Sequence, residues 1–206
     1  MVEHLLCKQR VRSSNLLIST SFLSNFNYQN MEKYNPLAII IHWFMALLII
    51  LMLILGFSLD ALKNYVDDIS LYYNLHKSFG VLAFFLVSVR ILNRLLNKAP
   101  NLPINFSKNE IRLAKVGHFA IYILMFAMPI SGYLMSSFAS YPVSFFSLSL
   151  PSFESNIFLA KKFKEIHKIS AFGISAILAF HILISLKHSY LDIPEKNIFK
   201  RMSLSK

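Results

Sequence analysis

The 206-residue chain is poor in charged residues and contains almost no cysteine. Asp, Glu, Lys and Arg together make up 15% of it, whereas a typical soluble domain contains roughly 25%. The one cysteine, Cys7, excludes a disulfide scaffold, a cysteine-ligated zinc site, an iron–sulfur cluster and a CxxCH haem attachment. Because 55% of the residues are apolar, the class that remains is an integral membrane protein with one compact helical unit.

Long runs without any charge locate the membrane spans, each of which needs about 20 apolar residues. Residues 34–59 form one such run, and residues 116–153 form another that is too long for one helix and is interrupted by prolines. A third run covers 169–186, whereas the remaining candidate contains Lys77, Arg90 and Arg94. We therefore predict an all-α membrane bundle of four helices, at about 36–59, 72–96, 113–138 and 165–189.

The basic residues are distributed unequally between the two sides of this bundle. With four spans both termini share one side, and that side holds 15 of the 21 Lys and Arg residues against six on the other. The positive-inside rule then places both termini in the cytoplasm. This topology accounts for the net charge of +11, so we expect no nucleic-acid partner.

The composition predicts three consecutive parts. Residues 1–33 are less apolar and predict a flexible cytoplasmic extension, residues 34–192 the four-helix domain, and residues 193–206 a basic cytoplasmic tail. Two other interpretations of the first part stay open. It is either a signal peptide, although no small-residue cleavage site stands out, or the product of an upstream start with Met31 as the natural first residue.

The prediction of function depends on six histidines that lie in or beside the spans: His42, His76, His118, His167, His181 and His188. An ionisable residue inside a membrane is costly and usually functional, although any single ring can be hydrogen-bonded to a neighbouring helix. His167 and His181 are 14 residues apart, so they share one helix face and are separated by about 21 Å along it.

Two further histidines stand at matching depths on their own helices. His42 lies near the cytoplasmic start of the first span and pairs with His181, while His76 lies near the outer start of the second and pairs with His167. Each pair can hold a planar macrocycle between two imidazoles, one on each face of an iron. The sequence therefore predicts two stacked haem sites inside the bundle.

Small and basic residues occur at the levels of the two pairs. An interval of 14 residues separates His42 from a glycine, His118 from another, and His76 from Arg90, and a third glycine follows His76 by four residues. Arg90 would balance a haem propionate beside the inner pair. Each glycine would make room beside a ring, unless it is an ordinary helix contact. These glycines are Gly56, Gly80 and Gly132.

Other metal chemistry fits the spans less well. No two histidines stand three or four residues apart, as a zinc site on one helix would need, and the predicted spans contain no carboxylate other than Glu165 at the very start of the fourth. A carboxylate-bridged di-metal centre is therefore excluded, and a proton-coupled transporter would lack its usual relay. A haem-free transporter whose histidines bind a transition metal remains a distant alternative.

Four segments closely resemble the prokaryotic cytochrome b-561 family: YNPLAIIIHW at 34–43, LHKSFGVLAFFLVSVRILNRL at 75–95, GHFAIYILMFAMPISGYLM at 117–135 and IHKISAFGISAILAFHILISLKHSYLD at 166–192. The resemblance runs from about Met31 to Met202, with the usual RM ending at 201–202. It implies a four-helix inner-membrane cytochrome with two non-covalent b haems. The axial ligands that it implies are the four paired histidines, whereas His118 also matches a family histidine but is not assigned to iron.

The resemblance further implies a quinone site at His188 on the cytoplasmic side, with ubiquinone as the expected substrate. His188 follows His181 by seven residues on the same helix face, below the inner pair. The alternative is a solvated interfacial histidine. The expected function is therefore electron transport between an outer-side donor and the quinone pool.

The same resemblance does not determine which molecule is the electron donor. The family includes reported superoxide oxidases that reduce ubiquinone, and similar cytochromes anchor periplasmic dehydrogenases, so the chain is either an oxidoreductase or a non-catalytic carrier. The basic run AKKFKEIHK at 160–168 approaches the outer pair. It would attract superoxide or an acidic donor protein, unless it is an ordinary solvated helix start.

Overall fold

The structure is a computed structural model that describes residues 32–100, 106–192 and 197–204. Within these ranges it contains four long helices: α2 (Pro36–Leu62), α3 (Ser70–Leu96), α4 (Lys108–Phe138) and α5 (Ile157–Tyr190). Each is long and apolar enough to cross a membrane, which confirms the predicted all-α membrane bundle. Most of the predicted N-terminal extension (1–31) and parts of the predicted tail (193–196 and 205–206) lie outside the described residues.

Helix α4 begins five residues before its predicted span, and α5 begins eight residues before its own. Both added segments contain charged residues and start at side-chain caps. Ser107 and Glu110 form a capping box, in which each side chain accepts a hydrogen bond from the other residue's backbone N–H. The Asn156 side chain accepts from the backbone N–H of Leu159. A charge-free run marks the part of a helix inside the bilayer and not the end of the helix.

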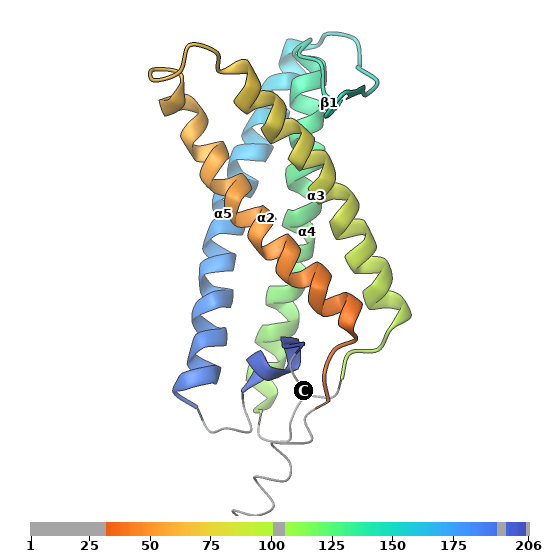
Figure 1. Cartoon of the computed structure of the whole chain (residues 1–206), viewed down its shortest axis with the longest axis vertical. Helices are drawn as coiled ribbons and strands as arrows, with labels where there is room; N and C mark the ends of the chain where they lie inside the picture. Colours follow the sequence, from red (N-terminus) through yellow and green to blue (C-terminus); the bar gives the residue numbers. More distant parts are fainter. Residues whose placement is uncertain (1–31, 101–105, 193–196, 205–206) are drawn as a thin grey trace, which may run out of the picture.

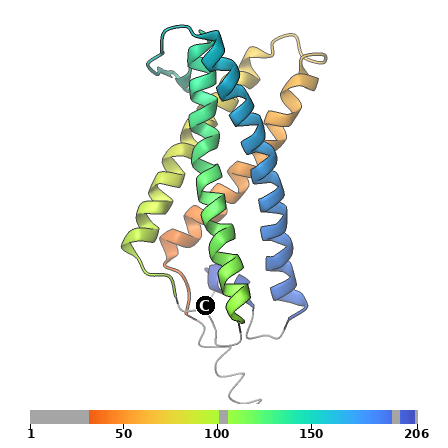
Figure 2. The ribbon, with the colours of Figure 1, turned by 180° about the vertical axis from the view of Figure 1, so that it is seen from behind.

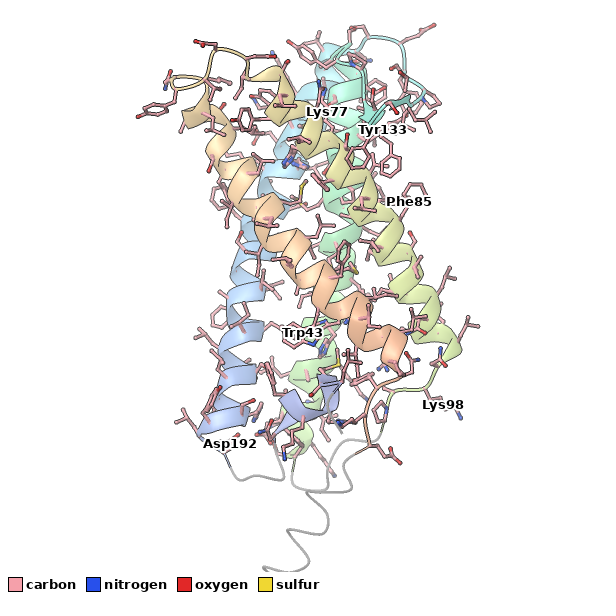
Figure 3. The ribbon with its side chains drawn as sticks, viewed as in Figure 1. Trp43, Lys77, Phe85, Lys98, Tyr133 and Asp192 are labelled. Atoms are coloured by element: carbon pink, nitrogen blue, oxygen red, sulfur yellow. The ribbon has the colours of Figure 1, made fainter. Side chains whose placement is uncertain are left out.

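The connection between α4 and α5 forms a small hairpin of β1 (Ser144–Phe145) and β2 (Leu148–Ser149). Ser78 in the first turns of α3 holds this hairpin, because its hydroxyl donates to the Ser144 carbonyl and accepts from the Phe146 N–H, both at 3.0 Å. Figure 3 shows Lys77 and Tyr133 at this end of the bundle. We call it the hairpin end.

The opposite end carries a short 3-10 helix, η2 (Ile198–Met202), beside the start of α2. The Tyr34 N–H donates to the Arg201 carbonyl at 3.2 Å, which joins the first and last described segments. The described chain therefore begins and ends at the same end of the bundle, as four spans require (Figure 1). We call it the terminal end.

The helices pack closely in three pairs, α4 with α5, α2 with α3, and α3 with α4. Figure 2 shows α4 and α5 running alongside each other, whereas α2 crosses the bundle obliquely (Figure 1). The buried core is an apolar cluster. Its members are Ile41, Met45, Val87, Met125 and Ile174. Ile174 stands seven residues from both His167 and His181, so on α5 the core lies between the two predicted histidine levels, whereas on α2 it extends to Ile41 beside His42.

Candidate cofactor-binding sites

The structure brings both predicted histidine pairs together. At the terminal end the ring centroids of His42 on α2 and His181 on α5 are 6.3 Å apart, with an interplanar angle of 70°. At the hairpin end His76 on α3 and His167 on α5 are also 6.3 Å apart, at 80°. Helix α5 contributes one ring to each pair, as its 14-residue interval requires.

The common spacing of 6.3 Å is what two imidazoles need in order to ligate one metal from opposite sides. A metal–imidazole bond is about 2.0 Å long and the nitrogen lies about 1.1 Å from its ring centroid, so such centroids are about 6.2 Å apart. The ring of His118 is closer to His181, at 5.6 Å. That distance is too short for opposite-side ligation, so the geometry favours His42 as the partner of His181.

The Nδ1 atoms of His167 and His76, the two histidines of the hairpin-end pair, have different surroundings. The His167 Nδ1–H donates to the Met128 carbonyl at 2.9 Å, and the Ser131 hydroxyl lies 3.3 Å from the same nitrogen. This contact fixes the ring orientation and leaves Nε2 for a ligand. The Nδ1 atom of His76 is buried and has no hydrogen-bond partner within the described part of the chain.

Two of the three predicted glycines lie directly against rings of the paired histidines. A Cβ atom at Gly56 would stand 3.0 Å from Cε1 of His76, and one at Gly132 would stand 3.0 Å from Cε1 of His167. What these glycines accommodate is therefore the imidazole ring itself. Gly80 differs, since the nearest atom to a Cβ there would be Cε of Met52, at an ordinary 3.8 Å.

Arg90 lies at the terminal-end pair, where it interacts electrostatically with His42, His118 and His181. The Nδ1–H of His118 donates to the Ala114 carbonyl one turn earlier in α4, at 2.6 Å. A guanidinium at this level is suited to binding an acidic group.

His188 lies at the end of α5, where it is 7% exposed. Its Nδ1–H donates to the Asp192 carboxylate at 2.5 Å, and the Phe106 ring lies 5.3 Å from the imidazole. Lys187 approaches the other carboxylate oxygen at 3.9 Å. The sequence analysis did not single out Asp192, although a histidine followed four residues later by an aspartate on a helix is a readable signal.

The basic run at the hairpin end forms the first turns of α5. Four of its lysines are exposed there: Lys161, Lys162, Lys164 and Lys168. The Lys162 ammonium lies 4.3 Å from the centre of the Phe158 ring. Lys164 also interacts electrostatically with Asp60, whose carboxylate pairs with Lys63 at 2.7 Å. The exposed lysines therefore lie on the surface of the end of the bundle that holds His76 and His167.

The fold and these sites define a class of protein, namely a four-span membrane protein with paired histidines at two levels. Within the described ranges no group of three His, Cys, Asp or Glu residues is placed to hold a bare metal ion. A sequence model of the family "Prokaryotic cytochrome b561" matches residues 33–202. The chain belongs to this family, and it is therefore a multi-pass membrane cytochrome of bacterial type.

Two relatives support the assignment. The chain is 29% identical to "Cytochrome b561 homolog 2" of Escherichia coli (strain K12) over 173 residues, which covers 83% of this chain and 91% of the relative. It is 30% identical to "Probable superoxide oxidase CybB" of Yersinia pestis over 165 residues, covering 78% and 90% respectively. Family membership implies b-type haem, and the two pairs of rings with centroids 6.3 Å apart fit that group.

Proposed function

We propose that the protein carries electrons across the bacterial inner membrane, between an outer-side donor and the quinone pool, with two non-covalent b haems per chain. The observation that carries this proposal is the equal 6.3 Å spacing of two histidine pairs at opposite ends of one bundle. When bound, a b-type haem supplies reversible one-electron chemistry. With two histidines to hold each haem, its iron would be suited to outer-sphere electron transfer rather than to oxygen binding.

Each of these residues has a defined task in the proposal. His42 and His181 would hold the haem iron at the terminal end, and His76 and His167 would hold the haem iron at the hairpin end. Arg90 would pair with a propionate at the terminal end, and its electrostatic reach to three histidines of that level supports the assignment. Met128 holds His167 in the orientation that directs Nε2 away from α4.

The terminal end faces the cytoplasm in this proposal, because the positive-inside rule places the richer set of Lys and Arg residues there. Ubiquinone would then bind beside His188. Asp192 accepts the Nδ1–H of His188, so Nε2 is the nitrogen available to a quinone oxygen. Quinone reduction takes up two protons, and an imidazole held by a carboxylate can deliver or accept one of them.

A second candidate function is superoxide:ubiquinone oxidoreduction. It is supported by the name of the Yersinia pestis relative and by the exposed lysines above the hairpin-end pair. In this reaction two superoxide anions would be oxidised to dioxygen, and the two electrons with two protons would reduce one ubiquinone to ubiquinol. The same lysines would suit an acidic periplasmic dehydrogenase for which the chain serves as membrane anchor.

A reduced-minus-oxidised absorbance spectrum of the detergent-purified protein, with haem-to-protein stoichiometry, tests the proposal. We expect two b haems per chain and a sharp low-spin α band. His42→Ala and His76→Ala should each remove one haem, whereas His118→Ala should retain both and is the matched control. A His118→Ala variant that loses a haem while His42→Ala keeps both would make His118 the ligand. Folded protein without haem would favour the metal transporter.

A further inference from the structure

Arg201 in η2 is deeply buried for an arginine, with 3% of its surface exposed. Its Nε donates to the Glu32 carbonyl at 3.2 Å and its Nη2 donates to the Pro100 carbonyl at 2.6 Å. The guanidinium carbon also lies 5.7 Å from the centre of the Tyr34 ring. One side chain near the end of the chain therefore joins the segment before α2 to the segment after α3.

Burial of this guanidinium has a cost that its contacts must offset. Desolvation lowers the pKa of Arg201, and the neighbouring Tyr34 and Glu32 raise it in part. Arginine nevertheless stays charged at neutral pH. A charged group buried this deeply destabilises the fold if its partners are removed, so the contacts of Arg201 fix the position of η2 firmly.

The residue after Arg201 contacts the helix that carries His42. The indole N–H of Trp43 donates to the Met202 carbonyl at 2.7 Å, and the Trp43 ring lies 5.4 Å from that of Phe199. Trp43 adjoins His42 in α2, with ring centroids 5.3 Å apart. Figure 3 shows Trp43 between α2 and η2. A continuous set of contacts thus runs from Arg201 through Met202 and Trp43 to His42.

We propose that Arg201 and Trp43 are positioning residues for His42, and that the segment 197–204 acts as a clasp at the terminal end. The clasp fixes the turn of α2 from which the His42 ring projects toward His181. This inference rests on the proposed function, since it takes His42 as an axial ligand. It assigns a task to the C-terminal segment that is separate from the quinone chemistry proposed for His188.

The test uses the full-length haem-loaded protein with Arg201→Gln and Trp43→Phe. The first variant removes the charged donors, and the second removes one indole donor while it keeps an aromatic ring. The matched control is Arg112→Gln, because Arg112 is an exposed arginine in the first turns of α4 at the same end. Three quantities are measured: the rate of haem transfer to excess apomyoglobin, the two midpoint potentials, and the emission of Trp43, the one tryptophan in the chain.

We expect both variants to affect one haem only. A lost neutral hydrogen bond corresponds to about fivefold faster loss of that haem in Trp43→Phe, and the lost charged bonds correspond to about tenfold or more in Arg201→Gln. One midpoint potential should shift while the other stays, and the Trp43 emission of Arg201→Gln should move to longer wavelength. Arg112→Gln should match the wild type in all three measurements.

Several results would overturn the clasp. Equal loss of both haems would show a general effect on folding, and unchanged potentials and loss rates in both variants would show that η2 does not act on His42. If Arg201→Gln fails to fold, Trp43→Phe decides between these outcomes alone. A wild-type protein without haem would refute the proposed function together with the clasp, whereas a wild type with two haems and unaffected variants would refute the clasp only.

Discussion

Replacing Gly132 by alanine is a sharp test of the hairpin-end site, because the structure gives the distances involved. The added Cβ would stand 3.0 Å from Cε1 and 3.2 Å from Nδ1 of His167. Ordinary carbon contacts begin near 3.5 Å, so the ring would have to move by about half an ångström. Such a movement pulls Nδ1 away from the Met128 carbonyl that fixes the ring.

The expected magnitude follows from two opposing effects. Overpacking of a filled site costs about 1–3 kcal/mol, while alanine in place of glycine inside a helix contributes about 1 kcal/mol of stability. We therefore expect Gly132→Ala to lower the free energy of unfolding by up to about 2 kcal/mol. The haem at the hairpin end should be weakened or lost, since its ligand can no longer keep its orientation.

Gly80→Ala is the matched control for this experiment. A Cβ at Gly80 meets only Cε of Met52 at 3.8 Å, which is an ordinary contact. The higher helix propensity of alanine should therefore dominate, and the free energy of unfolding should rise by up to about 1 kcal/mol. The assay combines thermal unfolding followed by circular dichroism, haem stoichiometry and a redox titration. If Gly132→Ala keeps both haems at unchanged potentials, or if the two alanine variants behave alike, the steric argument fails.

Three further predictions concern a hydroxyl, a carboxylate and a group of exposed lysines. Ser131→Ala removes a hydroxyl that lies 3.3 Å from Nδ1 of His167, so one midpoint potential should rise in a redox titration while the other stays; two unchanged potentials would contradict this. Asp192→Asn removes the carboxylate that holds His188 and should slow quinone reduction about tenfold with haem content unchanged, whereas wild-type kinetics would argue against a proton-transfer pair. A third variant replaces three exposed lysines of α5, Lys161, Lys162 and Lys164, by glutamine. Its reduction by superoxide should slow steeply at low ionic strength and approach the wild-type rate at high salt. Equal rates of the variant and the wild type at low salt would exclude electrostatic steering of superoxide by these lysines.

The fold class and the histidine pairing were predictable from sequence because both depend on local periodicity. A charge-free run of 26 residues predicts a span by length, and a helix face repeats within an interval of 14. The partner of Trp43 was not predictable in this way, since Met202 is 159 residues distant and accepts through its backbone. The capped first turns of α4 and α5, which contain charged residues, were not predicted for a different reason, because hydropathy locates the bilayer and does not detect caps.

The two histidine levels are restrained by different parts of the chain, and this difference makes their perturbations separable. At the hairpin end the restraint is local to the packed pair α4–α5, where Met128 accepts from His167 and Gly132 leaves room for its ring. Helix α2 packs closely against α3 and not against α5, and at the terminal end the contacts of η2 with Trp43 restrain it further. Changes in the Gly132 region should therefore act on one haem and changes in η2 on the other. A Gly132→Ala, Trp43→Phe double variant should show additive effects on the two potentials, because the two sites lie at opposite ends of the bundle and share no partner.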